Sequence, residues 1–129
     1  KFTTLDMNSI DLYTGEIEFI KVGASMSFIK KGDEVEVINS SSLPFGILDD
    51  INITPIKKKV KQGDIIITIS DGVIDKGNIG DYSWIVDYLK GEQNNPELIS
   101  REILELAKKK CDGKVLDDMT VVVSKLYAC

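Results

Sequence analysis

The sequence predicts an α+β fold built mainly on antiparallel sheet. Segments with strand patterning fill the first half of the chain, two helical patterns follow, and one more apolar strand comes last. Strands and helices that are segregated along a chain, rather than alternating, are typical of this fold class. At 129 residues the chain is expected to form a single domain, spanning residues 1–129.

Two β-hairpins are predicted near the start of the chain. Their four strands cover residues 2–12, 16–22, 26–31 and 34–38. Gly15 and Gly32 lie in the short connections between the paired segments, where turn residues are needed. The last of these strands, Glu-Val-Glu-Val-Ile, alternates polar and apolar residues strictly, which indicates a strand with one buried face.

The middle of the chain contains a loop, an extended segment and a buried strand. Residues 40–46 form a loop by their composition, and residues 49–60 alternate isoleucines with polar neighbours. The lysines at 57–59, with Lys61, are predicted to form a solvated strand face rather than a docking patch. Ile65–Ile69 is an unbroken β-branched run, the pattern of a strand buried on both faces.

Two helices and a final strand are predicted next. Asp81 is positioned to cap the first helix, which Gly91 closes. The second helix begins at Asn95, with Pro96 at its first position. Its apolar face is predicted to comprise Ile99, Ile103 and either Leu106 or Ala107. The last strand is expected over residues 119–126.

Charge and residue types exclude several classes of function. The net charge is −5 and the chain has no histidine. A nucleic-acid partner is not expected, because binding phosphates requires a basic face. Without histidine, no Ser-His-Asp or Cys-His nucleophile and no histidine-ligated zinc can form. Acid, base or metal chemistry would rest mainly on Asp and Glu, whose oxygens favour Mg²⁺ and Mn²⁺.

Cysteine usage and hydropathy predict a cytoplasmic location for this segment. Cys111 and Cys129 are too few for a disulfide framework, so free thiols in a reducing compartment are expected. No apolar run approaches the roughly 18 residues that a membrane span needs. The chain begins with Lys1 rather than methionine, which suggests a fragment or a processed piece.

Two acidic positions adjoin the most apolar strands. Asp71 follows Ile65–Ile69 almost directly, and the pair Asp117 and Asp118 precedes the last strand. One position is a C-terminal strand end and the other an N-terminal end, so we expect them on different edges of the sheet. An early start of the strand at Asp118, or a loop that folds back, would relieve this separation. Ser-Asp-Gly is also common turn chemistry, so on residue type alone a turn is the commoner role and a metal ligand the alternative.

The combination of motifs resembles a known family. "SDGVID" at residues 70–75 and "DDMTVVV" at residues 117–123 look like motifs of the PP2C-type, metal-dependent serine/threonine phosphatases. "SIDLYTGEIEFIKVGA" at residues 9–24 and "SSSLPFGILDD" at residues 40–50 are similar to the bacterial branch typified by stage II sporulation protein E. The resemblance covers essentially the whole chain.

The resemblance implies a fold and a site. The fold would be an antiparallel β-sandwich flanked by helices, in an αββα arrangement of which this chain is a partial domain, the C-terminal half. Aspartates at one edge of the sandwich would hold two Mn²⁺ or Mg²⁺ ions. By motif position Asp71 and Asp117 would be metal ligands. Asp118 would be a secondary, outer group, and Gly72 would let the chain turn close to the ions.

The resemblance also implies a reaction and a partner. The parent protein would hydrolyse phosphoserine on an anti-sigma-factor antagonist protein during sporulation, and upstream segments would anchor it to the inner membrane. The family carries a further aspartate-glycine motif upstream that this chain lacks. Asp6 and Asp11 match a later part of the pattern, so we leave them out of the site.

Two readings of the chain itself follow. In the first, it is part of the phosphatase but binds the ions weakly or not at all when isolated, and is inactive alone. In the second, it is a non-catalytic module that binds a partner or self-associates as a homo-oligomer. Surfaces that the missing half would cover motivate the second reading.

Overall fold

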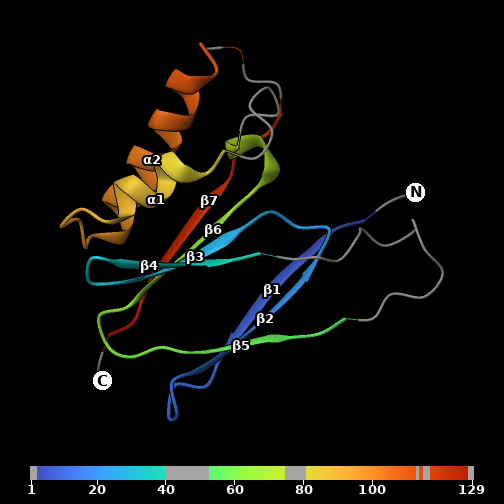
Figure 1. Ribbon diagram of the computed structural model, residues 1–129, viewed down its shortest axis with the longest axis vertical. Coiled ribbons are helices and arrows are strands. Elements are labelled where there is room, and N and C mark those ends of the chain that lie inside the picture. The colour runs from blue at the N-terminus through green and yellow to red at the C-terminus, as the bar shows by residue number, and fades with distance from the viewer. Residues whose placement is uncertain (1–2, 40–52, 75–80, 113, 115–116, 128–129) are drawn as a thin grey trace.

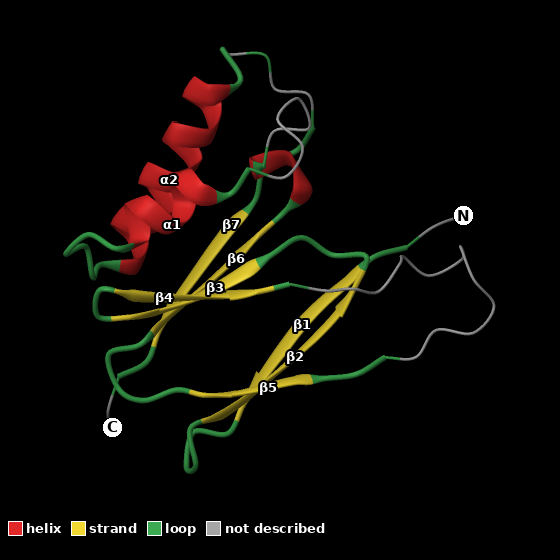
Figure 2. Cartoon of the chain, viewed as in Figure 1, coloured by secondary structure: helices red, strands yellow, loops and turns green. Residues whose placement is uncertain are grey.

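The computed structural model describes residues 3–39, 53–74, 81–112, 114 and 117–127. Its elements, drawn in Figures 1 and 2, are β1 (Leu5–Ile10), β2 (Glu16–Val22), β3 (Ser27–Lys31), β4 (Glu34–Ile38), β5 (Ile56–Lys59), β6 (Ile65–Ile69), the 3₁₀ turn η1 (Asp71–Val73), α1 (Ser83–Leu89), α2 (Pro96–Lys110) and β7 (Val121–Lys125). The predicted loop at 40–46 and residues 49–52 of the predicted extended segment lie outside the described residues.

The strands form two antiparallel sheets. β1, β2 and β5 make a three-stranded sheet in the order β1-β2-β5, and the four-stranded sheet has the order β4-β3-β6-β7. Both predicted hairpins are present: Ile10 pairs with Ile17 in the first, and Lys31 pairs with Glu34 in the second. The α+β prediction with antiparallel sheets is therefore confirmed.

The four-stranded sheet lies between two apolar cores. One core faces the three-stranded sheet and includes Ile17, Phe19 and Ile66. The other faces the helices and includes Ile65 and Ile67. Neighbouring residues of a strand point to opposite faces, so β6 is buried on both faces as its sequence predicts. Figure 1 shows both described helices on the outer side of this sheet, so the described helices flank the sandwich on one side.

The second helix begins as predicted. The Asn95 side chain caps it by accepting a hydrogen bond from Leu98 N at 3.1 Å, and Pro96 is its first residue. Its buried residues are Ile99, Ile103 and Ala107. In the described part of the chain, neither helix is long and apolar enough to cross a membrane.

The first helix is held at both ends by side chains. Its N-cap is Tyr82 rather than the predicted Asp81, whose carboxylate accepts hydrogen bonds from Ser83 N at 3.0 Å and Ser83 Oγ at 2.5 Å. At the other end, the buried ammonium of Lys30 donates to the carbonyls of the last helical residue and of Gly91. These bonds satisfy carbonyls that a helix end leaves without partners. Burial lowers the pKa of Lys30.

The strand observed in the predicted extended segment, residues 49–60, is shorter than predicted. Of its described residues, only Ile56–Lys59 pair in a sheet, as β5. The lysines at 57–59 are exposed, which confirms the predicted solvated face. Lys57 Nζ lies 3.3 Å from Glu18 Oε1 on β2, so opposite charges face each other across this exposed edge.

Candidate functional site

The two acidic segments meet at one end of the four-stranded sheet. β6 and β7 are antiparallel neighbours, with Ile69 opposite Val121. In an antiparallel pair the C-terminal end of one strand lies beside the N-terminal end of the other. Our expectation that Asp71 and Asp117 fall on different edges is therefore wrong. Asp118 does not begin the strand early, because β7 starts only at Val121.

Ser70 ties the two strand ends together. Its backbone N donates to Thr120 O at 3.0 Å. Its hydroxyl accepts a hydrogen bond from Thr120 N at 2.8 Å and donates to Asp118 O at 3.2 Å. One serine thus satisfies three backbone groups of the segment that carries Asp117 and Asp118.

Gly72 lets the acidic segment approach η1 closely. A Cβ at this glycine would lie 2.2 Å from Asp118 O and 3.1 Å from Asp117 O. Both contacts are with backbone atoms, so a side chain here would require the backbone to move. The next residue, Val73, is buried and anchors η1 in the core beneath the helices. The glycine after Asp71 is therefore explained by close backbone packing.

A pocket of about 390 Å³ lies beside these strand ends. The four residues predicted for the site all line it: Asp71, Gly72, Asp117 and Asp118. The three aspartates are exposed, and Asp117 Oδ1 accepts a hydrogen bond from Asp118 N at 2.8 Å. The lining also includes Ala24 and Ser25, from the connection between β2 and β3.

The pocket also contains an aspartate that the sequence analysis leaves out. Asp6, on β1, lines it, and β1–β2 pairing places this residue opposite Lys21. A signal was present in β2, where Lys21 follows Ile17 and Phe19 at the spacing of one strand face. Asp11 is different: its carboxylate accepts hydrogen bonds from the backbone of the β1–β2 turn, which lower its pKa.

The donor set of the pocket suits a hard divalent cation in part. Its described lining includes four aspartates and neither lysine nor arginine. Carboxylate oxygens are the ligands that Mg²⁺ and Mn²⁺ prefer. Within the residues that the structure describes, no three acidic or cysteine side chains gather closely enough to hold an ion. These residues therefore fit one part of a metal site.

Sequence comparison relates the chain to one family. The family model of stage II sporulation protein E (SpoIIE) matches residues 1–127. Two curated relatives carry the same name: one from Bacillus subtilis (strain 168) is 34% identical over 128 residues, and one from Priestia megaterium is 38% identical over 128 residues. Both matches cover 97% of this chain, but the chain spans only 16% and 22% of the length of these relatives.

Comparison with solved structures gives the same relationship. The phosphatase domain of the cell fate determinant SpoIIE from Bacillus subtilis, presoaked with manganese, is 35% identical to the chain with a TM-score of 0.82. That match covers 98% of this chain and 57% of the solved domain. The catalytic domain of the serine/threonine phosphatase PstP, in complex with 2 manganese ions, is 19% identical with a TM-score of 0.68, over 98% of this chain and 60% of that one. The two sheets and the outer helices thus have the architecture of PP2C phosphatase domains.

Proposed function

Because this chain belongs to the stage II sporulation protein E family, we propose that it forms the C-terminal part of a phosphatase domain that hydrolyses phosphoserine with the help of metal ions. The family match over residues 1–127 supports the proposal, as does the likeness to a solved phosphatase domain of which the chain covers 57%. The share of that domain that the chain lacks leaves room for further ligands of the site.

We assign metal binding to Asp71 and Asp117. Two bound Mn²⁺ or Mg²⁺ ions would acidify water and polarise phosphoryl oxygens. The chain itself holds the ligands in place: Ser70 binds the backbone beside Asp118, and Gly72 permits the close approach of the acidic segment. Asp118 is assigned a secondary role as an outer group that orients a ligand.

One observation carries this assignment. Asp71 and Asp117 are far apart in the sequence, yet they line the same pocket because the ends of β6 and β7 lie side by side. Two exposed carboxylates that follow or precede paired strands can supply the first ligands of a cation site, because ligands fixed by strands keep their positions. A turn residue with no other role would not need a second acidic segment clamped beside it.

The substrate and setting form a finer part of the proposal. We propose that the phosphoserine lies on an anti-sigma-factor antagonist protein and that hydrolysis occurs in the cytoplasm during sporulation. The sporulation names of the two relatives support the setting. The test compares hydrolysis of the phosphorylated antagonist with hydrolysis of a phosphopeptide of its sequence. Equal rates on both would contradict recognition of the folded protein.

The isolated chain is expected to show no Mn²⁺-stimulated hydrolysis of a phosphoserine substrate. Its described residues supply only part of a ligand set, and affinity for a hard cation depends on the number of anionic ligands. Phosphate release is measured across a Mn²⁺ titration, with a complete phosphatase domain of the same protein as positive control. Strong turnover by the isolated chain would refute the partial site. A complete domain that is equally inactive would favour the non-catalytic module.

In the complete protein, Asp71→Ala is expected to abolish Mn²⁺-dependent hydrolysis, because it removes an assigned ligand without disturbing the buried strand below. The matched control is Asp87→Ala, which removes an exposed carboxylate from α1, outside the pocket lining. Phosphate release and calorimetric titration with Mn²⁺ are measured on both variants. If Asp71→Ala is as active as Asp87→Ala, Asp71 is not a ligand.

A further inference from the structure

The connection between β2 and β3 has two roles at once. It carries the chain from the three-stranded sheet to the four-stranded sheet, and its residues Ala24 and Ser25 line the same acidic pocket as Asp71 and Asp117. The position of this crossover therefore affects the shape of the pocket. Whatever fixes the crossover also fixes one wall of the site.

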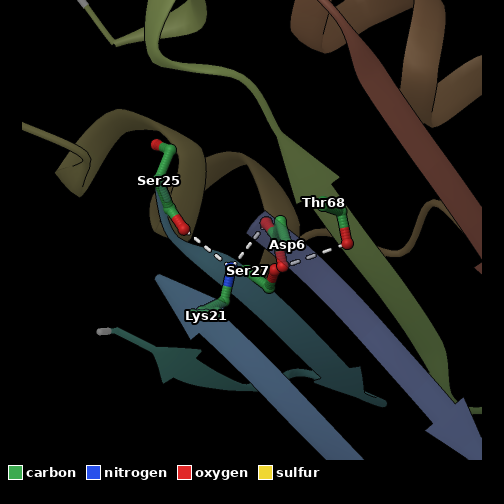
Figure 3. A network of polar contacts seen from close by, with 5 residues as sticks. All are labelled: Asp6, Lys21, Ser25, Ser27 and Thr68. Atoms are coloured by element: carbon green, nitrogen blue, oxygen red, sulfur yellow. Dashed lines mark hydrogen bonds and ion pairs between the residues drawn. The ribbon is translucent and has the colours of Figure 1, made fainter. Parts of the chain in front are cut away.

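A buried ammonium group holds this crossover. The side chain of Lys21, the last residue but one of β2, is only 1% exposed. Its Nζ lies 2.7 Å from Asp6 Oδ2 and donates to Ser25 O, also at 2.7 Å, as Figure 3 shows. One lysine thus joins the edge strand β1, its own strand and the crossover. Burial lowers the pKa of Lys21, and the bond to Asp6 partly offsets this effect.

The contacts continue into the strand that carries Asp71. Ser27, the first residue of β3, is fully buried and pairs with Thr68 of β6, and the two hydroxyls lie 3.4 Å apart. Thr68 lines the pocket and lies three residues before Asp71. Figure 3 shows the contacts of Lys21 with Asp6 and Ser25 beside the contact between Ser27 and Thr68. Lys21 and Ser27 thus hold the crossover at its two ends.

Stability alone does not account for a charged pair at this place. Burying two charges costs desolvation energy, and a well-packed apolar pair of similar size is often as stable or more stable. The neighbouring inward residues of β2, Ile17 and Phe19, are apolar and fully buried. An apolar residue at position 21 would continue that face but could not hold the Ser25 carbonyl or the Asp6 carboxylate.

We propose that Lys21 is a positioning residue of the acidic pocket: its ammonium holds Asp6 and the Ser25 carbonyl so that the crossover forms a fixed wall of the pocket that Asp71 and Asp117 also line. The proposal rests on the proposed phosphatase function for its effect on rate, but not for its effect on the wall. Lys21 does not line the pocket, so it acts through Asp6 and Ser25 and not by touching a substrate.

The proposal separates the wall from the metal ligands. In Lys21→Met, the crossover loses its donor while Ser70, Gly72 and the acidic segment keep their contacts. We therefore expect kcat/KM for a phosphoserine substrate to fall by about tenfold to hundredfold, the usual effect of losing an outer-shell partner. Mn²⁺ affinity is expected to stay close to that of the unchanged protein, whereas Asp71→Ala loses both.

The test uses the complete protein and a matched control. Lys57→Met removes a lysine from another cross-strand ion pair, at the exposed β5 edge away from the pocket. Hydrogen exchange of residues 22–26 is followed by mass spectrometry, together with kcat/KM and calorimetric Mn²⁺ affinity. Faster exchange at 22–26 in Lys21→Met, with exchange unchanged in Lys57→Met, supports the proposal. Unchanged exchange and unchanged kcat/KM in a folded Lys21→Met would overturn it.

If Lys21→Met does not fold, Asp6→Asn tests the positioning role instead. This variant keeps the size of the side chain and removes only the charge that holds the ammonium. Faster exchange at residues 22–26 in Asp6→Asn supports the wall, and unchanged exchange with unchanged kcat/KM refutes it. If the unchanged protein shows no Mn²⁺-dependent hydrolysis, the proposed function fails, while the exchange measurement still supports or overturns the positioning role.

Discussion

At the scale of single residues, backbone contacts place the acidic groups of the pocket. Ser70 binds three backbone groups of residues 118–120 with its own N–H and hydroxyl. Gly72 contributes by lacking a side chain, since any Cβ there would meet Asp118 O. A single hydrogen bond contributes only about 1 kcal/mol to stability, so the importance of these residues lies in position.

Gly72→Ala is expected to weaken Mn²⁺ binding by about tenfold or more in the complete protein, the size of effect seen when an outer-shell group is lost. The reason is steric: the new Cβ would lie 2.2 Å from a backbone oxygen, so the acidic segment must shift. The matched control is Gly91→Ala, whose Cβ would have the flexible end of the Gln93 side chain as its nearest neighbour. Calorimetric titration measures the Mn²⁺ affinity of both variants. Equal affinities would contradict the close approach of the acidic segment to Gly72.

At the scale of elements, strand and helix ends decide where functional groups lie. The C-terminal end of β6 and the N-terminal end of β7 coincide because the strands are antiparallel neighbours. The helix α2 begins directly after its N-cap residue, Asn95. Its buried face packs on the side of the four-stranded sheet that faces away from β2. The rigid sheet end and the outer helix together fix the position of η1.

Asn95→Ala is expected to lower the free energy of unfolding by about 1 kcal/mol, the usual cost of losing an N-cap side chain. The substitution removes the acceptor for Leu98 N, a backbone donor with no partner inside the helix. Asn94→Ala is the matched control, because Asn94 is exposed and lies just before the cap. Urea unfolding followed by circular dichroism measures both. A cost of the same size for Asn94→Ala would show that capping is not the cause.

At the scale of the whole molecule, the four-stranded sheet carries both cores. Its inner face packs on the three-stranded sheet through Ile29 and Ile66, and its outer face packs on the helices through Phe28 and Ile67. The pocket opens at the end of this sheet and takes its lining from both sheets. Packing between the sheets therefore governs the distance from Asp6 to the acidic strand ends.

Ile66→Ala is expected to destabilise the chain by about 2–5 kcal/mol, because it leaves a cavity between the sheets. Ile66 is 3% exposed and belongs to the inner core. The same substitution at Ile53, which is 39% exposed, is the control and is expected to change stability by no more than about 0.5 kcal/mol. Urea unfolding of the two variants gives the comparison. A small effect at Ile66 would mean that the two sheets do not pack tightly.

Much of the fold could be predicted because its causes are local. The turn glycines at 15 and 32 mark the two hairpins, the β-branched run 65–69 marks a buried strand, and Asn95 with Pro96 marks a helix start. The N-cap lies one residue later than predicted, at Tyr82, although the Asp81 carboxylate still accepts hydrogen bonds from Ser83, the first residue of the helix. Asp71 and Asp117 were named from motifs, and their role as ligands remains a prediction.

The sequence by itself determined the strands, the helices and the acidic motifs, since turn chemistry, hydrophobic period and capping act over a few residues. Only the tertiary structure decided that Asp71 and Asp117 share a pocket, that Asp6 lines it too, and that Lys21 holds Asp6 from behind the lining. The reason is that pairing of β6 with β7 and packing of one sheet on the other join residues far apart in the chain. Local patterns show which face of a strand is buried, but not which distant strand end lies beside it.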